Sequence, residues 1–108
     1  IGYSKQENLL VIYLGSKGKY IKHNIEQVGT TSAVMISPQD IARNALINRA
    51  SAVIVSHNHP SGDINPSQND INLTLEISKM LKNIKVVLQD HFIFGDNKYY
   101  SFEENGYL

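Results

Sequence analysis

The sequence predicts an α/β domain built on one mixed sheet, with strands and helices in the order β-β-α-β-α-β-β. Short runs of strand-forming residues alternate with two longer segments whose apolar residues recur at helical spacing. Each of these two segments begins with a serine that is followed three residues later by an aspartate, a pattern typical of helix starts. The chain has 108 residues, so we expect a single domain over residues 1–108.

The first two predicted strands form an antiparallel hairpin. Residues 9–14 are rich in strand formers and end at Gly15. A turn over residues 16–19 follows, and residues 20–28 then alternate imperfectly between apolar and polar side chains. Glu7 stands at the start of the first strand, where a lone glutamate is most often solvated.

The first predicted helix follows a connection over residues 29–36. Ser37 is suited to the N-cap, Pro38 to the first helical position, and Asp40 to the first turn. The apolar stripe behind this start consists of Ile41, Ala42, Ala45 and Leu46. We expect the helix to end near Arg49.

The second half of the chain predicts a strand, a long helix and a final hairpin. Residues 52–55 form a short apolar run typical of a buried strand. The helix over residues 66–83 carries a broad apolar stripe, so we expect it to pack on the sheet. The remaining elements are a strand at 85–88, the run 92–94, a turn at 95–97 and a strand at 98–102.

Two histidines and an aspartate stand where a predicted strand ends and a predicted helix begins. His57 and His59 follow the strand at 52–55, and Asp70 lies in the first turn of the next helix. Side chains of an extended chain alternate between faces, so both histidines project to one side if the strand geometry persists through them. Pro60 favours this, because a residue before proline is held out of the α region. Two imidazoles and a carboxylate placed in this way predict a metal site.

These residue types suit zinc. Two nitrogens and one oxygen leave the fourth position of a tetrahedral zinc ion for water, which is the catalytic pattern, whereas structural zinc usually has four protein ligands. A simpler interpretation also fits: Ser67 and Asp70 form a capping box ahead of an apolar helix, and the two histidines are a surface pair. The two interpretations are compatible, because the helix dipole keeps an aspartate in the first turn ionised.

The spacing His57-x-His59, seven residues, Ser67, two residues, Asp70 resembles the JAMM (MPN+) metalloprotease motif. The form His-Asn-His-Pro-Ser-Gly-Asp-x-x-Pro-Ser-x-x-Asp is similar to the RadC branch of that superfamily, as is Asp-His-Phe-Ile-Phe-Gly at residues 90–95. The resemblance covers nearly the whole chain. It implies a three-layer α/β/α JAB/MPN domain that shares its architecture with the cytidine deaminases.

The resemblance also implies a function, which is zinc-dependent hydrolysis of peptide or isopeptide bonds in a substrate that the sequence does not identify. The implied Zn²⁺ ligands are His57, His59 and Asp70. Glu7 matches the essential glutamate that JAMM proteins carry at the start of the first strand, and it would act as the base. Glu26, on the second predicted strand, is the competing candidate. Ser67 would donate a hydrogen bond to the developing oxyanion.

Three other functions compete with this one. A deaminase would need His-x-Glu and Pro-Cys-x-x-Cys, which the sequence lacks. RadC proteins are traditionally named for DNA repair, so the runner-up is a role that acts through DNA or a protein partner. A net charge of zero, with no recognisable reading helix, supports nucleic-acid binding only weakly. A metal-free scaffold is disfavoured, because every ligand position is filled.

Asp90 and His91 follow the predicted strand at 85–88. His91 could approach the metal, but the simpler interpretation is a structural histidine whose hydrogen bonds are satisfied. Asp90 is a candidate acceptor for orienting a ligating histidine.

Composition bounds the remaining classes. The sequence contains no cysteine, which excludes a disulfide scaffold and thiolate chemistry. Without a run of membrane-spanning length or a visible signal peptide, we expect a cytoplasmic protein that does not act on membranes. The chain starts at Ile1 rather than methionine, which favours a fragment of a longer protein. The oligomeric state is left open.

Overall fold

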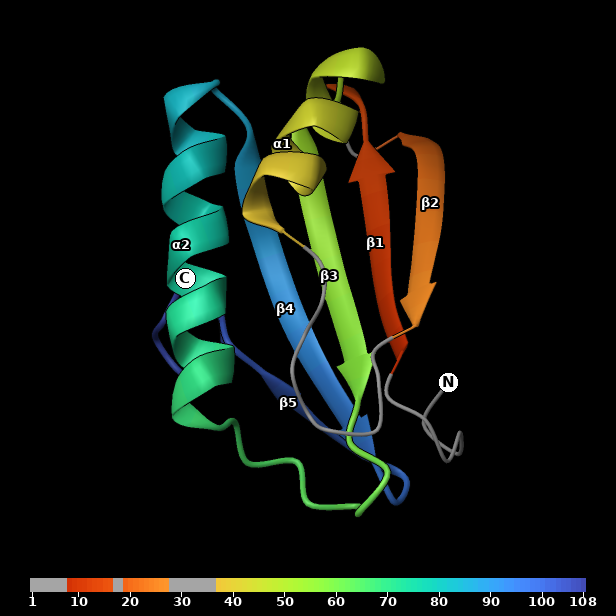
Figure 1. Cartoon of the computed structure of the whole chain (residues 1–108), viewed down its shortest axis with the longest axis vertical. Coiled ribbons are helices and arrows are strands. Elements are labelled where there is room, and N and C mark those ends of the chain that lie inside the picture. The colour runs from red at the N-terminus through yellow and green to blue at the C-terminus, as the bar shows by residue number, and fades with distance from the viewer. Residues whose placement is uncertain (1–7, 17–18, 28–36) are drawn as a thin grey trace.

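The structure is a computed structural model that describes residues 8–16, 19–27 and 37–108, with the backbone alone described at 23–27. Five strands form one sheet in the order β2-β1-β3-β4-β5, and two helices complete the fold (Figure 1). The strands β3 and β4 are parallel, and the other neighbours are antiparallel. The elements are β1 (Asn8–Leu14), β2 (Tyr20–Gln27), α1 (Pro38–Ile47), β3 (Ala52–Asn58), α2 (Gln68–Asn83), β4 (Val87–Gly95) and β5 (Lys98–Ser101).

The predicted α/β class, mixed sheet and element order are confirmed. The main difference along the chain is that β4 is one unbroken strand, whereas the sequence predicted a strand at 85–88 and a separate run at 92–94. It is unbroken because it pairs with β3 from Ala52↔Val87 to Asn58↔Phe94. One extra residue, Gln89, is accommodated by a shift of register between Val53 and Ile54.

Both helices lie on the same face of the sheet and contact each other (Figure 1). They share one core with residues of β1, β3 and β4 that point to that face. The described residues therefore form two layers, which differs from the α/β/α expectation. The opposite face is also apolar but less covered: Phe92 and Phe94 are half-buried there, and Tyr99 is 52% exposed. Neither α1 nor α2 has the length and apolar character needed to cross a membrane.

The C-terminal end of β3 and the N-terminal end of α2 lie at the same end of the molecule. Residues 59–67 cross that end of the sheet and lead into α2 (Figure 1). Two backbone contacts hold this loop against β4. The His59 N–H donates to the Phe94 carbonyl at 2.8 Å, and Gly62, which has a positive φ of 85°, lies directly against Gly95.

We expect Gly95→Ala to displace the loop. An added Cβ would lie 3.0 Å from three backbone atoms of Gly62, and backbone cannot rotate away. The substitution should lower the free energy of unfolding by about 1–3 kcal/mol, the usual cost of overpacking, as measured by urea denaturation. Gly15→Ala is the control, because its Cβ would meet the mobile end of the Ile21 side chain at 3.2 Å. Equal stability of the two variants would contradict this account of the loop.

Candidate metal centre

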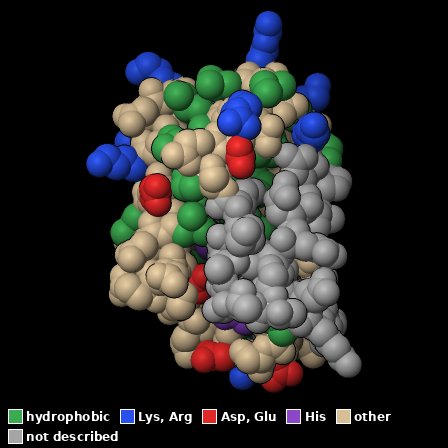
Figure 2. Space-filling view, in the orientation of Figure 1, with side chains coloured by type: hydrophobic (Ala, Val, Ile, Leu, Met, Phe, Trp, Pro, Cys, Tyr) green, Lys and Arg blue, Asp and Glu red, His purple; other side chains and the backbone are tan. Residues whose placement is uncertain are grey.

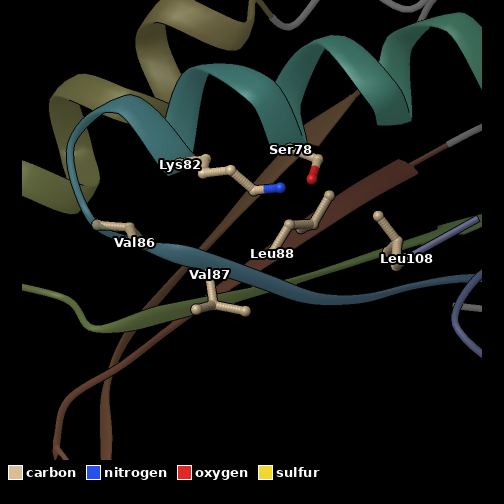
Figure 3. Close-up of a pocket in the computed structure, with 6 residues that line it drawn as sticks. All are labelled: Ser78, Lys82, Val86, Val87, Leu88 and Leu108. Atoms are coloured by element: carbon tan, nitrogen blue, oxygen red, sulfur yellow. The ribbon is translucent and has the colours of Figure 1, made fainter.

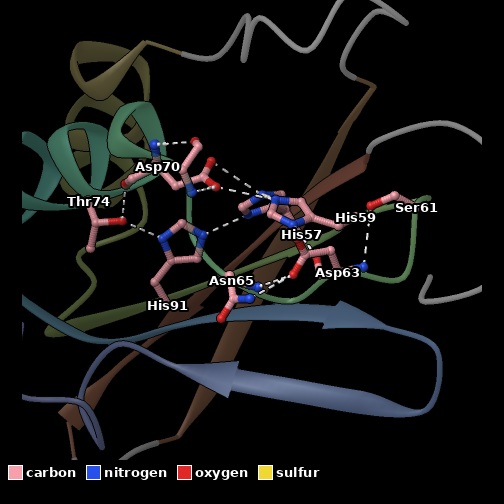
Figure 4. Close-up of polar contacts among 9 residues, drawn as sticks. His57, His59, Ser61, Asp63, Asn65, Asp70, Thr74 and His91 are labelled. Carbon is pink, nitrogen blue, oxygen red and sulfur yellow. Dashed lines mark hydrogen bonds and ion pairs between the residues drawn. The ribbon is translucent and has the colours of Figure 1, made fainter.

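Both histidines are held in place by β3 and by the backbone hydrogen bond that follows its last residue. His57 lies in β3 between Leu9 of β1 and Ile93 of β4, and only 2% of it is exposed. His59 follows the strand, and its N–H is bound by β4, so the extended backbone continues through it. The two rings therefore lie on one side of the chain, 4.8 Å apart between centroids (Figure 4). This is the arrangement that strand alternation predicted.

The start of α2 positions the third residue. The Asp70 N–H donates to Ser67 Oγ at 3.0 Å, and the Ser67 N–H donates to Asp70 Oδ2 at 2.9 Å. The predicted capping box is thus confirmed. The same carboxylate also faces the two histidines, so the cap and the candidate site share one side chain (Figure 4).

The three side chains bring ligand atoms to the spacing of a metal site. Nε2 of His57 and Nε2 of His59 are 3.0 Å apart. The Asp70 carboxylate lies 3.5 Å from His57 Nε2 through Oδ1 and 3.3 Å from His59 Nε2 through Oδ2. Bonds of about 2.0–2.1 Å in a tetrahedron place neighbouring ligands about 3.3 Å apart. The two nitrogens are thus near this spacing from each other, and each is near it from a different oxygen of the Asp70 carboxylate, so the three residues form a group that could hold a metal ion.

Hydrogen bonding assigns the proton of His59. Its Nδ1 lies 2.7 Å from the carbonyl oxygen of Asp63, which can only accept, so Nδ1 carries the hydrogen. Nε2, the other ring nitrogen, lies 3.0 Å from His57 Nε2 and 3.3 Å from Asp70 Oδ2, so it is the His59 atom that could bind a metal. The Asp63 side chain holds the loop in turn, because its Oδ1 accepts from the backbone and side-chain N–H groups of Asn65, each at 3.0 Å.

Burial and charge set the protonation of the site. Burial lowers the pKa of His57 to about 4, and the opposing effect of the Asp70 charge is smaller. Burial alone would raise the pKa of Asp70, but hydrogen bonds from His59 and Ser67 and the charge of His57 hold it well below the usual range. Near neutral pH, His57 is therefore a neutral base and Asp70 an anion, as metal ligands must be.

The site is open to solvent on one side. The His59 side chain is 14% exposed, whereas that of His57 is 2% exposed. In the space-filling view, histidine atoms reach the surface on the face that carries the helices (Figure 2).

The other predicted site residues are placed less completely. Glu7 lies outside the described residues. The backbone of Glu26 pairs with Leu9 in the β1–β2 ladder, and its side chain is not described. Ser67 adjoins Asp70 through the capping box and is exposed.

The prediction that Asp90 orients a ligating histidine is wrong. Its carboxylate accepts from the backbone N–H groups of His91 and Glu103 and from the Ser101 hydroxyl. His91 faces the site instead: its Nε2 lies 2.8 Å from Nδ1 of His57. The extra residue in β4 exchanges the faces of Asp90 and His91, and no local pattern of residues predicts it.

Thr74 was missed as well. It is fully buried on α2, one turn after Asp70, and contacts both the Asp70 carbonyl and His91. A threonine within the apolar stripe of a helix, four residues after a candidate ligand, was the available signal.

A comparison with family models matches residues 1–107 to the RadC-like JAB domain. The chain belongs to this family. Among curated relatives, UPF0758 proteins of Carboxydothermus hydrogenoformans and Fusobacterium nucleatum are 44% and 41% identical over 94% and 100% of the chain. A UPF0758 protein of Methanococcoides burtonii is 36% identical over 96% of it. The alignments cover 45%, 47% and 45% of these relatives, so this RadC-like JAB domain spans about half of their length.

We expect the metal-free domain to lose stability as the pH falls below about 6.5. Burial lowers the pKa of His57 to about 4 and that of His91 to about 3, from 6.5, so the unfolded chain binds protons that the folded chain does not. Each histidine then contributes a slope of up to about 1.4 kcal/mol per pH unit, and the lowered pKa of Asp70 extends the loss to lower pH.

Urea unfolding in a chelator, between pH of about 7 and about 5, measures this slope. His91→Gln should reduce it by the share of one histidine. A free energy of unfolding that stays constant over this range would contradict the assignment of two neutral buried histidines.

Proposed function

We propose that this domain is a zinc-dependent hydrolase of peptide or isopeptide bonds. The observation that carries the proposal is that Nε2 of His57, Nε2 of His59 and the Asp70 carboxylate converge, with separations of 3.0, 3.3 and 3.5 Å. Three protein ligands leave one position open, which distinguishes a catalytic from a structural zinc site. Membership of the RadC-like JAB family supports the same reading.

Bound at this site, zinc would polarise the scissile carbonyl and make water more acidic, from a pKa of about 16 toward about 7. The residues around it would bind the metal and orient the reacting groups. His57 offers a neutral nitrogen, His59 offers Nε2, and Asp70 offers an anion that its hydrogen bonds keep ionised. One negative ligand leaves the site with net positive charge once zinc is bound, which suits the stabilisation of a developing oxyanion.

Glu7 is proposed as the base that takes a proton from the attacking water and passes it to the leaving amine. The position of Asn8, the next residue in the chain, supports this role for Glu7. The Asn8 N–H donates to Oδ1 of Asn58 at 2.6 Å, so the described part of β1 begins beside the end of β3. Asn8, the residue next to Glu7, therefore lies beside the end of the strand that leads to the two histidines.

Ser67 is proposed to donate a hydrogen bond to the oxyanion. Its Oγ accepts from the Asp70 N–H, which fixes the hydroxyl at the start of α2. It is exposed beside the ligand carboxylate, where a substrate carbonyl would lie. A DNA-associated role stays a prediction for which the described residues offer no added support.

The decisive comparison is between His57→Ala and Glu7→Gln. On a panel of peptide and isopeptide substrates, we expect turnover by the zinc-loaded wild type alone. His57→Ala should lose zinc, because it removes one of three ligands. Glu7→Gln should keep zinc while its rate falls by about 10²–10⁴, the usual worth of a positioned base. Metal content by elemental analysis and initial rates provide the two readouts.

Three results would count against the proposal. No turnover by a zinc-loaded wild type on any substrate would remove the hydrolase. Loss of zinc from Glu7→Gln would make Glu7 a ligand. An unchanged rate in Glu7→Gln would place the base elsewhere, with Glu26 the next residue to test.

Asp70→Asn should separate the ligand role of Asp70 from its capping role. Asparagine can still cap the helix but is a weaker zinc ligand, so zinc affinity should fall by more than the 10- to 100-fold typical of groups behind a ligand. Asp40→Asn is a matched control: it removes a carboxylate from the same position of α1, three residues after the N-cap Ser37. Zinc titration against a chromophoric chelator measures both, and similar affinities would exclude Asp70 as a ligand.

A further inference from the structure

A line of hydrogen bonds runs behind the candidate metal centre and links two of its ligands. Thr74 Oγ1 lies 2.7 Å from the backbone carbonyl oxygen of Asp70 and 2.6 Å from Nδ1 of His91. The other ring nitrogen of His91, Nε2, lies 2.8 Å from Nδ1 of His57 (Figure 4). The Asp70 backbone carbonyl is thus linked to His57 through Thr74 and His91. The Asp70 carboxylate faces His57 directly from the other side.

The donor and acceptor of every hydrogen bond in this line follow from the Asp70 carbonyl at its end, which can only accept. A carbonyl has no hydrogen, so the close approach of Thr74 Oγ1 to the Asp70 oxygen requires the hydroxyl to donate there. The threonine hydrogen is then used, and the contact between Oγ1 and His91 Nδ1 requires the hydrogen to be on His91. A neutral His91 with Nδ1–H has a lone pair on Nε2, which accepts from Nδ1–H of His57.

We propose that Thr74 and His91 are positioning residues that hold His57 as the Nδ1–H tautomer, so that its Nε2 lone pair faces the metal position. This rests on the proposed function, because it concerns how that metal centre is prepared. Nε2 of His59, whose Nδ1–H is bound to Asp63, faces the same position beside the Asp70 carboxylate.

The surroundings keep this line in place. Thr74 is fully buried and His91 is 1% exposed, so the hydrogen bonds do not compete with water. The His91 ring stacks on Phe102, with centroids 4.6 Å apart and planes 12° apart, which limits its rotation. Burial also lowers the pKa of His91 to about 3, which keeps the ring neutral near neutral pH.

The opposite direction would disable the site. If His91 donated from Nε2, His57 would accept at Nδ1 and carry its hydrogen on Nε2, where it would point at the metal position. Zinc would then have to displace that hydrogen and reverse the whole line. Thr74 opposes the reversal, because its single hydrogen already lies between two oxygens 2.7 Å apart.

Histidine tautomers can be read directly from ¹⁵N-labelled protein by long-range ¹H–¹⁵N spectra. We expect Nδ1–H for His91 in the metal-free and the zinc-loaded protein, and Nδ1–H for His57 in both. His91 protonated at Nε2 would overturn the proposal. This measurement uses the wild type, so it decides the point even if the variants fail to fold.

Two variants of Thr74 test the effect on metal binding. Thr74→Val keeps the shape and removes the hydroxyl, so His91 should populate the other tautomer and zinc affinity should fall about 10- to 100-fold. Thr74→Ser restores the hydroxyl and should bind zinc within about 3-fold of wild type. Ser78→Ala removes a hydroxyl from the next turn of α2, where Ser78 lines a separate groove against β4 (Figure 3), and should change neither readout.

The outcomes separate this proposal from the proposed function. Wild-type tautomers and affinity in Thr74→Val would overturn the positioning role while leaving zinc hydrolysis intact. A wild type that binds no zinc would overturn the metal centre, and the tautomer of His91 would still show whether the line of hydrogen bonds runs in the stated direction. A loss of affinity in Thr74→Val that Thr74→Ser does not restore would also overturn it, since packing rather than the hydroxyl would then be responsible.

Discussion

The parallel pairing of β3 with β4 is the constraint on which the rest of the site depends. Parallel neighbours require a crossover, so α2 must start near the end of β3, and Asp70 is thereby brought to the histidines. The same pairing binds His59 through Phe94 and places His91 behind His57. The candidate centre thus lies at the carboxyl end of a parallel strand, where α/β folds commonly bind ligands.

The features that could be predicted from the sequence are those with local causes. Strand alternation placed His57 and His59 on one side, and a capping signal placed Asp70 at the start of a helix. The contact between Thr74 and His91 depends instead on how α2 lies across β4 and on the extra residue in β4. Neither is visible in local patterns, so the sequence alone does not place His91 beside His57.

Local sequence patterns also could not predict that both helices lie on one face of the sheet. β1 and β4 carry apolar residues on both faces, which is what a sheet between two helical layers would show. Burial distinguishes the faces: Leu9 and Val11 are fully buried under the helices, whereas Leu10 and Ile12 on the other face are half-buried. Helix placement depends on the crossovers between strands, and residue type alone does not fix it.

The double use of the Asp70 carboxylate has an evolutionary consequence. A descendant that no longer needed a metal could replace either histidine without loss at the helix start, but replacing the aspartate would weaken the cap as well. Selection for folding alone would therefore retain the aspartate. Among related sequences, the histidine pair is a better indicator of a working metal centre than the aspartate is.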